Sequence, residues 1–169
     1  AVCWALLFGA ASRAAVVPPP RAALLQAQSR AHALTKRPST SSVRNVVAAA
    51  SQLAHATDPA LWINASEAVA PSYGTDVFLH SIAALTDLGS LAGASVPAAG
   101  AASRLIVGAA HVLAAGVIRQ ATGGKAQLLA AAKRDLAVGD REASARRRIS
   151  AVRSYAKAWK TAFSALTQL

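Results

Sequence analysis

The sequence contains no methionine, one cysteine and few aromatic residues. A single cysteine, Cys3, excludes a disulfide within the chain and a zinc site built on cysteines. This favours a reducing compartment over a secreted scaffold, so we expect the sequon at Asn64 to be fortuitous. From the absence of methionine, an initiator included, we expect a chain that is processed or incomplete at its start.

Acidic residues are also scarce: there are 7, against 18 lysines and arginines, and the net charge is +11. They are scattered singly along the chain, which leaves little for paired-carboxylate catalysis. No phosphate-binding loop surrounds Gly124-Lys125, and no serine lies in a Gly-x-Ser-x-Gly turn. The sequence therefore predicts a protein that is not an enzyme and has no small-molecule substrate.

Hydrophobic residues make up 54% of the chain, but many of them are alanine, and aromatic residues account for only 5%. Alanine buries little area, so a core made of it depends on close approach of helix backbones. High apolar content and high positive charge rarely occur on one segment. We therefore expect an all-α fold of several short helices, with the two properties on different segments.

Residues 1–42 lack acids and are rich in Arg, Ser and Ala, which is the composition of an organellar transit peptide. Ala1–Ala11 is apolar enough for a signal-peptide core ahead of a plastid transit segment. A solvated basic arm is the alternative. Pro18–Pro20 predicts a stiff extended stretch, and Lys36–Ser42 a linker. This region is therefore expected to be an import-like or extended arm.

Residues 43–70 are expected to form short helices, the first of them capped by Ser42. Asp58-Pro59 should end that helix and start another, with Asp58 as N-cap and an apolar anchor that includes Trp62. After a turn at 71–74, residues 75–122 predict an apolar helical pair. Asp76 and His80 are four residues apart, which favours a polar contact within one helix over a metal site.

The second helix of this pair could lie at membrane level. Its 21 residues, 98–118, match the thickness of a bilayer core of about 30 Å. Glycines recur in it at eight-residue intervals, which keeps small residues on a loosely common face for close helix contact; they are Gly100, Gly108 and Gly116. A helix buried within a soluble bundle is the alternative interpretation, because few of its residues are large and apolar.

Arg104 and His111 interrupt this segment and lie near the same face. Ionisable groups at membrane depth are candidates for function, because leaving them unpaired is costly. Small residues flank His111, so a haem or chlorophyll ligand is one interpretation. A hydrogen-bonded structural histidine, or a contact with a lipid or quinone headgroup, is the favoured one. No other cofactor and no metal are expected.

Residues 125–169 predict a basic amphipathic helical region. Gly139-Asp140 should break it, with Asp140 capping the last helix. Apolar residues in that helix alternate at spacings of three and four, in the order Ile149, Val152, Ala156, Trp159, Phe163 and Leu166. Cationic residues lie beside this seam, namely Arg146, Arg153, Lys157 and Lys160.

Docking of this cationic helix on a partner or an anionic membrane is the favoured interpretation, with Trp159 and Phe163 as anchors. Packing within the chain and binding of RNA phosphates by Arg146-Arg147-Arg148 are the alternatives, and nucleic acid is the least favoured. The candidate lipid- or partner-binding residues are therefore Arg104, Arg146, Arg153, Lys157, Trp159, Lys160 and Phe163.

Together these features predict a non-catalytic accessory subunit of a large organellar energy-transducing complex, with other subunits and membrane lipid as partners. The mitochondrial inner membrane, with its respiratory chain and ATP synthase, is the first expectation, because both charged ends suit a surface rich in acidic lipid. A photosystem accessory subunit of the plastid thylakoid membrane is the alternative that the apolar start favours. A mitochondrial ribosomal protein is favoured by the charge and disfavoured by the apolar content.

Overall fold

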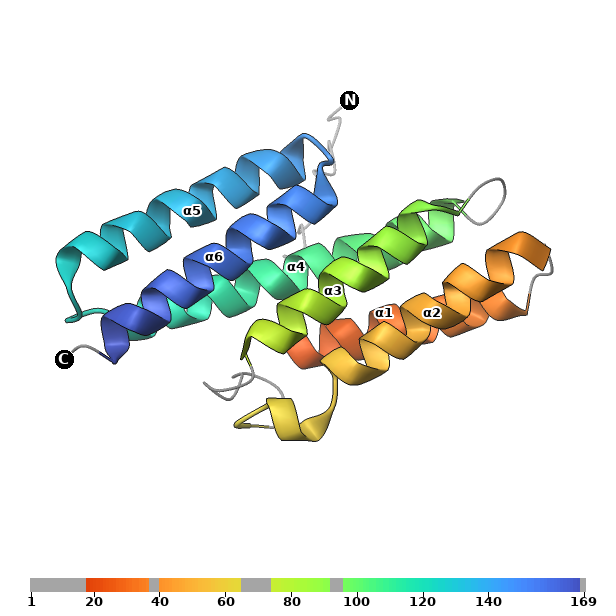
Figure 1. Cartoon of the computed structure of the whole chain (residues 1–169), viewed down its shortest axis with the longest axis horizontal. Coiled ribbons are helices and arrows are strands. Elements are labelled where there is room, and N and C mark those ends of the chain that lie inside the picture. Colours follow the sequence, from red (N-terminus) through yellow and green to blue (C-terminus); the bar gives the residue numbers. More distant parts are fainter. Residues whose placement is uncertain (1–17, 37–39, 65–73, 92–95, 168–169) are drawn as a thin grey trace, which may run out of the picture.

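The computed structural model describes residues 18–36, 40–64, 74–91 and 96–167. Throughout these ranges the regular elements are helical, which confirms the all-α class (Figure 1). In chain order they are α1 (Pro20–Thr35), α2 (Thr40–Ala56), the short 3-10 helix η1 (Pro59–Leu61), α3 (Gly74–Gly89), α4 (Val96–Gln120), α5 (Ala126–Ser144) and α6 (Arg148–Leu166). The import-like start at 1–17 and the turn at 71–73 lie outside the described residues.

The central element of the bundle is α4. It packs mainly against α1 and α6, and more lightly against α3 and α5. In Figure 1 the α5–α6 hairpin lies on one side of α4, and α1 and α2 lie on the other. The core is therefore built around α4, and each site described below lies on this helix or on one of its neighbours.

Alanine makes up more than half of the buried hydrophobic residues. The fully buried alanines include Ala27 and Ala31 of α1, Ala102 and Ala114 of α4, and Ala162 of α6, each 0% exposed. Larger side chains fill the remaining space between helices, among them Leu24, Leu53, Phe78, Ile106 and Tyr155. The expected core of closely approaching helices is therefore present, with a minority of bulky residues.

The expectation of an extended arm over 1–42 is wrong for Pro20–Thr35, which forms α1, and for 40–42, which begin α2, so Ser42 lies inside that helix and is not its N-cap. Pro19 is the N-cap residue of α1 and Pro20 its first helical residue. Proline is well accepted at this position because the first N–H groups of a helix have no intrahelical acceptor. Ala23, Leu24, Ala27, Ala31 and Leu34 are then buried on one side of the helix, and this face holds it against the core.

The break at Asp58 is confirmed. Asp58 Oδ1 accepts a hydrogen bond of 2.9 Å from the backbone N–H of Ala60, and Pro59 is the first residue of η1. Trp62 then turns into the core, where its Nε1 donates to the backbone oxygen of Ala56 at 3.1 Å. The cap and the buried tryptophan together fix the chain direction after α2.

The expected break at Gly139-Asp140 is wrong, because α5 continues through it to Ser144. Gly139 is buried, and a Cβ atom there would overlap the ring of Tyr155. The glycine therefore allows α5 and α6 to approach closely. Asp140 is not an N-cap either; it accepts a hydrogen bond from the hydroxyl of Tyr155.

From Pro97 to Gln120, α4 is long and apolar enough to cross a membrane, by length and composition. Core helices of soluble proteins have the same two properties. Four other helices contact α4, and 44% of its most apolar window is buried among them. The helix is thus partly enclosed by the chain itself, and its remaining surface is open.

Candidate functional site

A polar cluster joins the three C-terminal helices around Asp140. The hydroxyl of Tyr155 donates to Asp140 Oδ1 at 2.9 Å, and His111 Nε2 lies 3.5 Å from the same oxygen. The rings of His111 and Tyr155 meet edge to face, with centroids 5.4 Å apart. Burial raises the pKa of Tyr155, and its hydrogen bond to Asp140 raises it further, so the phenol is protonated at neutral pH.

His111 is therefore one member of a polar contact between α4 and α5. Its side chain is 41% exposed, and its Nε2 faces a carboxylate. A ligand role toward haem or chlorophyll stays a prediction, and it would fall to Nδ1 unless Asp140 moved. Among the described residues, no group of three or more His, Cys, Asp or Glu side chains could hold a metal ion.

The two aromatic residues expected to dock on a partner, Trp159 and Phe163, pack within the chain instead. Trp159 is only 4% exposed and packs against Phe78 of α3, with ring centroids 5.9 Å apart. A Cβ atom at Gly74 would overlap its ring. This corrects the expectation that Trp159 anchors a partner, because its surface is already used within the chain. Phe163 stacks on Trp159 and is half-buried at the edge of the core.

The cationic residues of α6 are on the surface. Arg153, Lys157 and Lys160 are all exposed, and their spacing of four and three residues places them on one helix face. Lys157 Nζ contacts Asp135 Oδ1 of α5 at 3.0 Å. The apolar and cationic sides of α6 are therefore separated as expected, and the apolar side packs inward.

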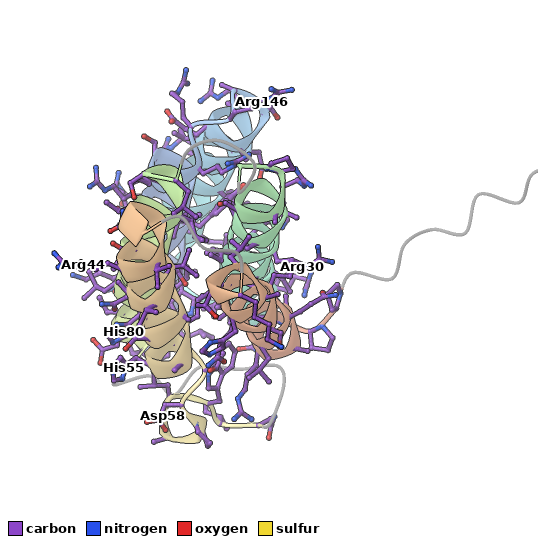
Figure 2. The ribbon with its side chains drawn as sticks, turned by 90° about the vertical axis from the view of Figure 1, so that its right-hand side faces the viewer. Arg30, Arg44, His55, Asp58, His80 and Arg146 are labelled. Carbon is purple, nitrogen blue, oxygen red and sulfur yellow. The ribbon has the colours of Figure 1, made fainter. Side chains whose placement is uncertain are left out.

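A second group of cations gathers at the end of the bundle where α5 turns into α6. Arg146 lies in this turn (Figure 2), and its φ angle is 60°. Arg147 pairs with Glu142, with an Nε–Oε2 distance of 3.0 Å. A Cβ atom placed on Gly100 would lie 3.8 Å from Arg104 Nη1 and 3.9 Å from Arg148 Nη2, so those two guanidinium groups are neighbours.

This juxtaposition brings Arg104 to Arg148, which is 44 residues away in the sequence. It arises because α4 packs against α6. No spacing along the chain indicates it. Both arginine segments were candidates from the sequence, but their proximity in the fold was not predicted.

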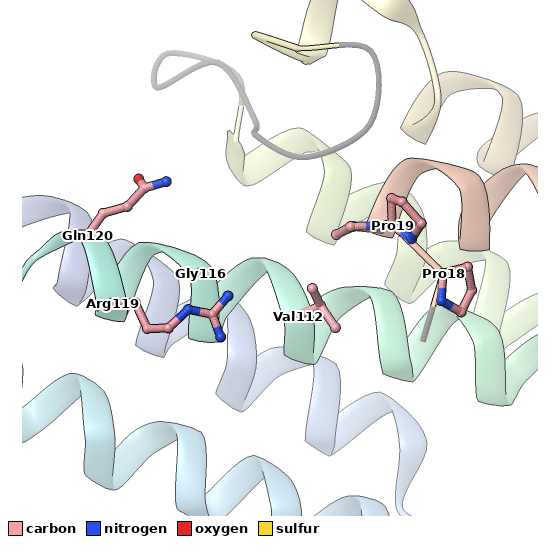
Figure 3. Close-up of a pocket in the computed structure, with 7 residues that line it drawn as sticks. Pro18, Pro19, Val112, Gly116, Arg119 and Gln120 are labelled. Atoms are coloured by element: carbon pink, nitrogen blue, oxygen red, sulfur yellow. The ribbon is translucent and has the colours of Figure 1, made fainter. Parts of the chain in front are cut away.

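One flank of α4 is only half-buried beside the start of α1. A hollow of about 530 Å³ lies there (Figure 3), lined by Pro18, Pro19, Pro20, Val112, Gly116, Arg119 and Gln120. A Cβ atom at Gly108 or Gly116 would meet nothing within 4 Å. Within the described part of the chain these two glycines therefore pack against no other helix, and close packing against a partner helix stays a prediction.

Two histidines that the sequence places in separate segments meet between α2 and α3. The rings of His55 and His80 stack with centroids 5.2 Å apart (Figure 2). His80 Nδ1 lies 2.7 Å from Gln52 Oε1, so the neutral ring donates to the amide oxygen. Burial lowers the pKa of His80, and the neighbouring His55 lowers it further, although Asp76 acts in the opposite direction.

Comparisons with known proteins give no information about function, so a functional proposal must rest on the arrangements described above. No protein-family model matches the chain, and searches of curated proteins and of solved structures give no match.

Proposed function

We propose that this chain is a non-catalytic helical accessory subunit of an organellar energy-transducing membrane complex, in the respiratory chain or ATP synthase of the mitochondrial inner membrane. The observation that carries the proposal is the half-buried flank of α4. A helix long and apolar enough for a bilayer leaves this flank only partly covered by the rest of the described chain.

The flank has the residues that helix packing in a membrane favours. Gly108 and Gly116 are separated by about two turns, so they lie near one face, and Val112 lies between them. Small residues let a second helix approach closely where no water drives association. The hollow at Gly116 supplies a concave surface for such a helix or for an acyl chain.

The charge of the surface supports the same assignment. In the described residues, three ion pairs are formed, namely His111–Asp140, Arg147–Glu142 and Lys157–Asp135. Most lysines and arginines of the described residues are exposed on the surface. Anionic headgroups attract such cations by about 1 kcal/mol each near the surface. In this proposal the face with Arg153, Lys157 and Lys160 lies toward headgroups.

Extraction of organelle membranes tests the proposal directly. We expect the chain to remain with the membrane in high salt, and to migrate with a large complex in native electrophoresis. Release by salt alone would contradict the membrane assignment. Sedimentation with ribosomes would identify the ribosomal alternative, and co-purification with chlorophyll the photosystem alternative.

Two substitutions isolate the half-buried flank from the fold. Gly108→Leu and Gly116→Leu add a large side chain at positions where the Cβ atom meets no other element within 4 Å, so the isolated protein should stay folded. Both should reduce incorporation into the complex, because the partner could no longer approach. Ala54→Leu, at an exposed position of α2, is the matched control and should incorporate normally. Equal incorporation of all three variants would argue against this flank as the contact surface.

A further inference from the structure

We propose that a hollow at the α5–α6 turn binds a phosphate group carried on a small organic molecule. The hollow has a volume of about 260 Å³ and is lined by Leu85 and Gly89 of α3, Ser103 of α4 and residues 146–150. We call it the arginine pocket. It does not depend on the proposed function, because a phosphate ester can be a lipid headgroup or a free metabolite.

Two arginines without a carboxylate partner among the described residues line the arginine pocket, and a third lies beside one of them. Glu142 neutralises Arg147, but within the described part of the chain no carboxylate pairs with Arg146 or Arg148. Arg104 approaches Arg148 from α4, and both guanidinium groups come within 4 Å of one point at Gly100. Like charges held this close repel each other, and an anion between them removes the repulsion. Guanidinium groups bind phosphate oxygens through paired hydrogen bonds.

The first turn of α6 adds backbone donors to the same hollow. Its N-cap residue is Arg147, whose side chain makes no capping hydrogen bond. The N–H groups of Arg148, Ile149 and Ser150 therefore lack an intrahelical acceptor and a cap from the N-cap side chain, and the Glu142 carboxylate contacts the side chain of Ser150. These three residues line the arginine pocket. The partial positive charge of the helix end reinforces the arginines rather than acting alone.

Arg146 occupies a backbone conformation that normally belongs to glycine. Arg147 N–H bonds to the oxygen of Glu142, and Arg146 N–H bonds to that of Ala143, which is the Schellman arrangement at a helix end. Its left-handed residue is usually glycine, and a larger residue is disfavoured by about 1 kcal/mol. Strain of this kind is concentrated at functional sites. In this position the arginine side chain starts at the lip of the pocket, at one end of the bundle (Figure 2).

The size and walls of the pocket define the class of ligand. At about 260 Å³ it is smaller than the pockets of roughly 300–1,000 Å³ that enclose drug-sized ligands. It therefore suits a phosphate group with a short attachment. Leu85 and Ile149 add apolar surface beside the cations, where the carbon atoms of a glycerol unit would lie. A glycerol phosphate, free or as the headgroup of phosphatidic acid, combines these features.

Binding to the purified full chain tests the proposal with two probes. Glycerol 3-phosphate is titrated by calorimetry, and vesicles of equal parts phosphatidylcholine and phosphatidic acid are tested by flotation against vesicles of phosphatidylcholine alone. We expect saturable binding to at least one probe. Binding of glycerol 3-phosphate identifies a free phosphate ester as a sufficient ligand, and binding to the acidic vesicles alone identifies the lipid headgroup. Absence of binding to both probes overturns the proposal.

Matched variants decide whether the arginine pocket is responsible. Arg146→Asn retains a residue that tolerates the left-handed conformation, and Arg148→Gln removes the cation beside Arg104. Each should weaken binding by about tenfold or more, because a charge-assisted contact is lost. Arg134→Gln removes the same charge from an exposed position of α5 and should leave binding unchanged. An equal loss in all three variants overturns the proposal, since it indicates diffuse attraction to a polyanion such as RNA. Circular dichroism verifies that each variant is folded.

Discussion

Gly139 of α5 lies directly against the ring of Tyr155 of α6, with no room for a Cβ atom between them. The same tyrosine donates a hydrogen bond to Asp140, the next residue of α5. Close backbone approach and a polar bond thus fix the hairpin at one place. The glycine is required for packing and not for a turn.

Replacing Gly139 by alanine should destabilise the protein. Overpacking costs about 1–3 kcal/mol, which exceeds the gain of about 1 kcal/mol in helix propensity. Gly108→Ala is the matched control, because nothing lies within 4 Å of its Cβ position, and it should stabilise the protein by up to about 1 kcal/mol. Urea denaturation followed by circular dichroism measures both. A Gly139→Ala protein as stable as the wild type would show that α5 and α6 can separate without loss.

Arg146→Gly should raise the free energy of unfolding by about 1 kcal/mol, because it relieves the left-handed conformation of a residue with a side chain. The control is Arg141→Gly, which removes the same side chain from an exposed position within α5. It should lower the free energy of unfolding by about 1 kcal/mol. Thermal denaturation in high salt, which suppresses general charge effects, gives both values. A loss of stability in Arg146→Gly would contradict the assigned strain.

Trp159 combines a well-packed ring with an unsatisfied polar atom. Its Nε1 is buried and has no hydrogen-bond partner in the described structure. We expect Trp159→Phe to have a small effect, since the lost packing is offset by removal of an unpaired donor whose burial costs about 1–3 kcal/mol. Trp159→Ala should cost about 3–5 kcal/mol through the cavity it leaves. Chemical denaturation distinguishes the two, and equal losses would indicate that the indole N–H is satisfied.

The contact between His55 and His80 should make stability depend on pH. The pKa of His80 is lower in the folded protein than its ordinary value of 6.5, so the unfolded chain binds the proton more readily. The contribution of His80 to the free energy of unfolding is therefore fully present above pH 6.5, and it is lost as the pH decreases toward the pKa of the folded protein. Protonation of the ring also brings a positive charge against His55.

Melting temperatures measured between about pH 5 and 8, where histidine is the main titrating side chain, test this expectation. The wild type should lose stability on the acidic side of the range, and His80→Gln should lose less. His32→Gln, at an exposed position of α1, should behave as the wild type does. A wild-type curve that is flat over this range would contradict the assigned direction of the shift.

Local patterns predicted the features that depend on neighbouring residues. The apolar run at 98–118 lies within α4, and Asp58 caps η1, because hydrophobic length and capping are properties of short segments. The seam of α6 was predicted only in part: Val152 and Trp159 are buried, but the rest of the buried face is made by residues outside the predicted seam, namely Ala151, Tyr155, Ala158, Ala162 and Ala165. Trp159 packs within the chain, which was the alternative to docking on a partner. An apolar face has the same sequence pattern whether it covers its own core or a partner.

The features that were missed depend on contacts between distant segments. Gly139 predicts a helix break when only its neighbours in sequence are considered, and its role in packing is visible only once Tyr155 lies against it. Pro20 similarly predicts an extended stretch, and the helix that it begins is stabilised by packing on α4. The neighbouring guanidinium groups of Arg104 and Arg148 likewise require α4 and α6 to be in place. Spacing along one helix contains no information about which helix will lie across from it.

The predominance of alanine in the core has a consequence for the temperature dependence of stability. A methyl group exposes little apolar surface when the chain unfolds, and the heat capacity of unfolding increases with that surface. This bundle should therefore have a smaller heat-capacity change than a leucine-rich bundle of equal length. Its free energy of unfolding should therefore vary little with temperature and should have a broad maximum.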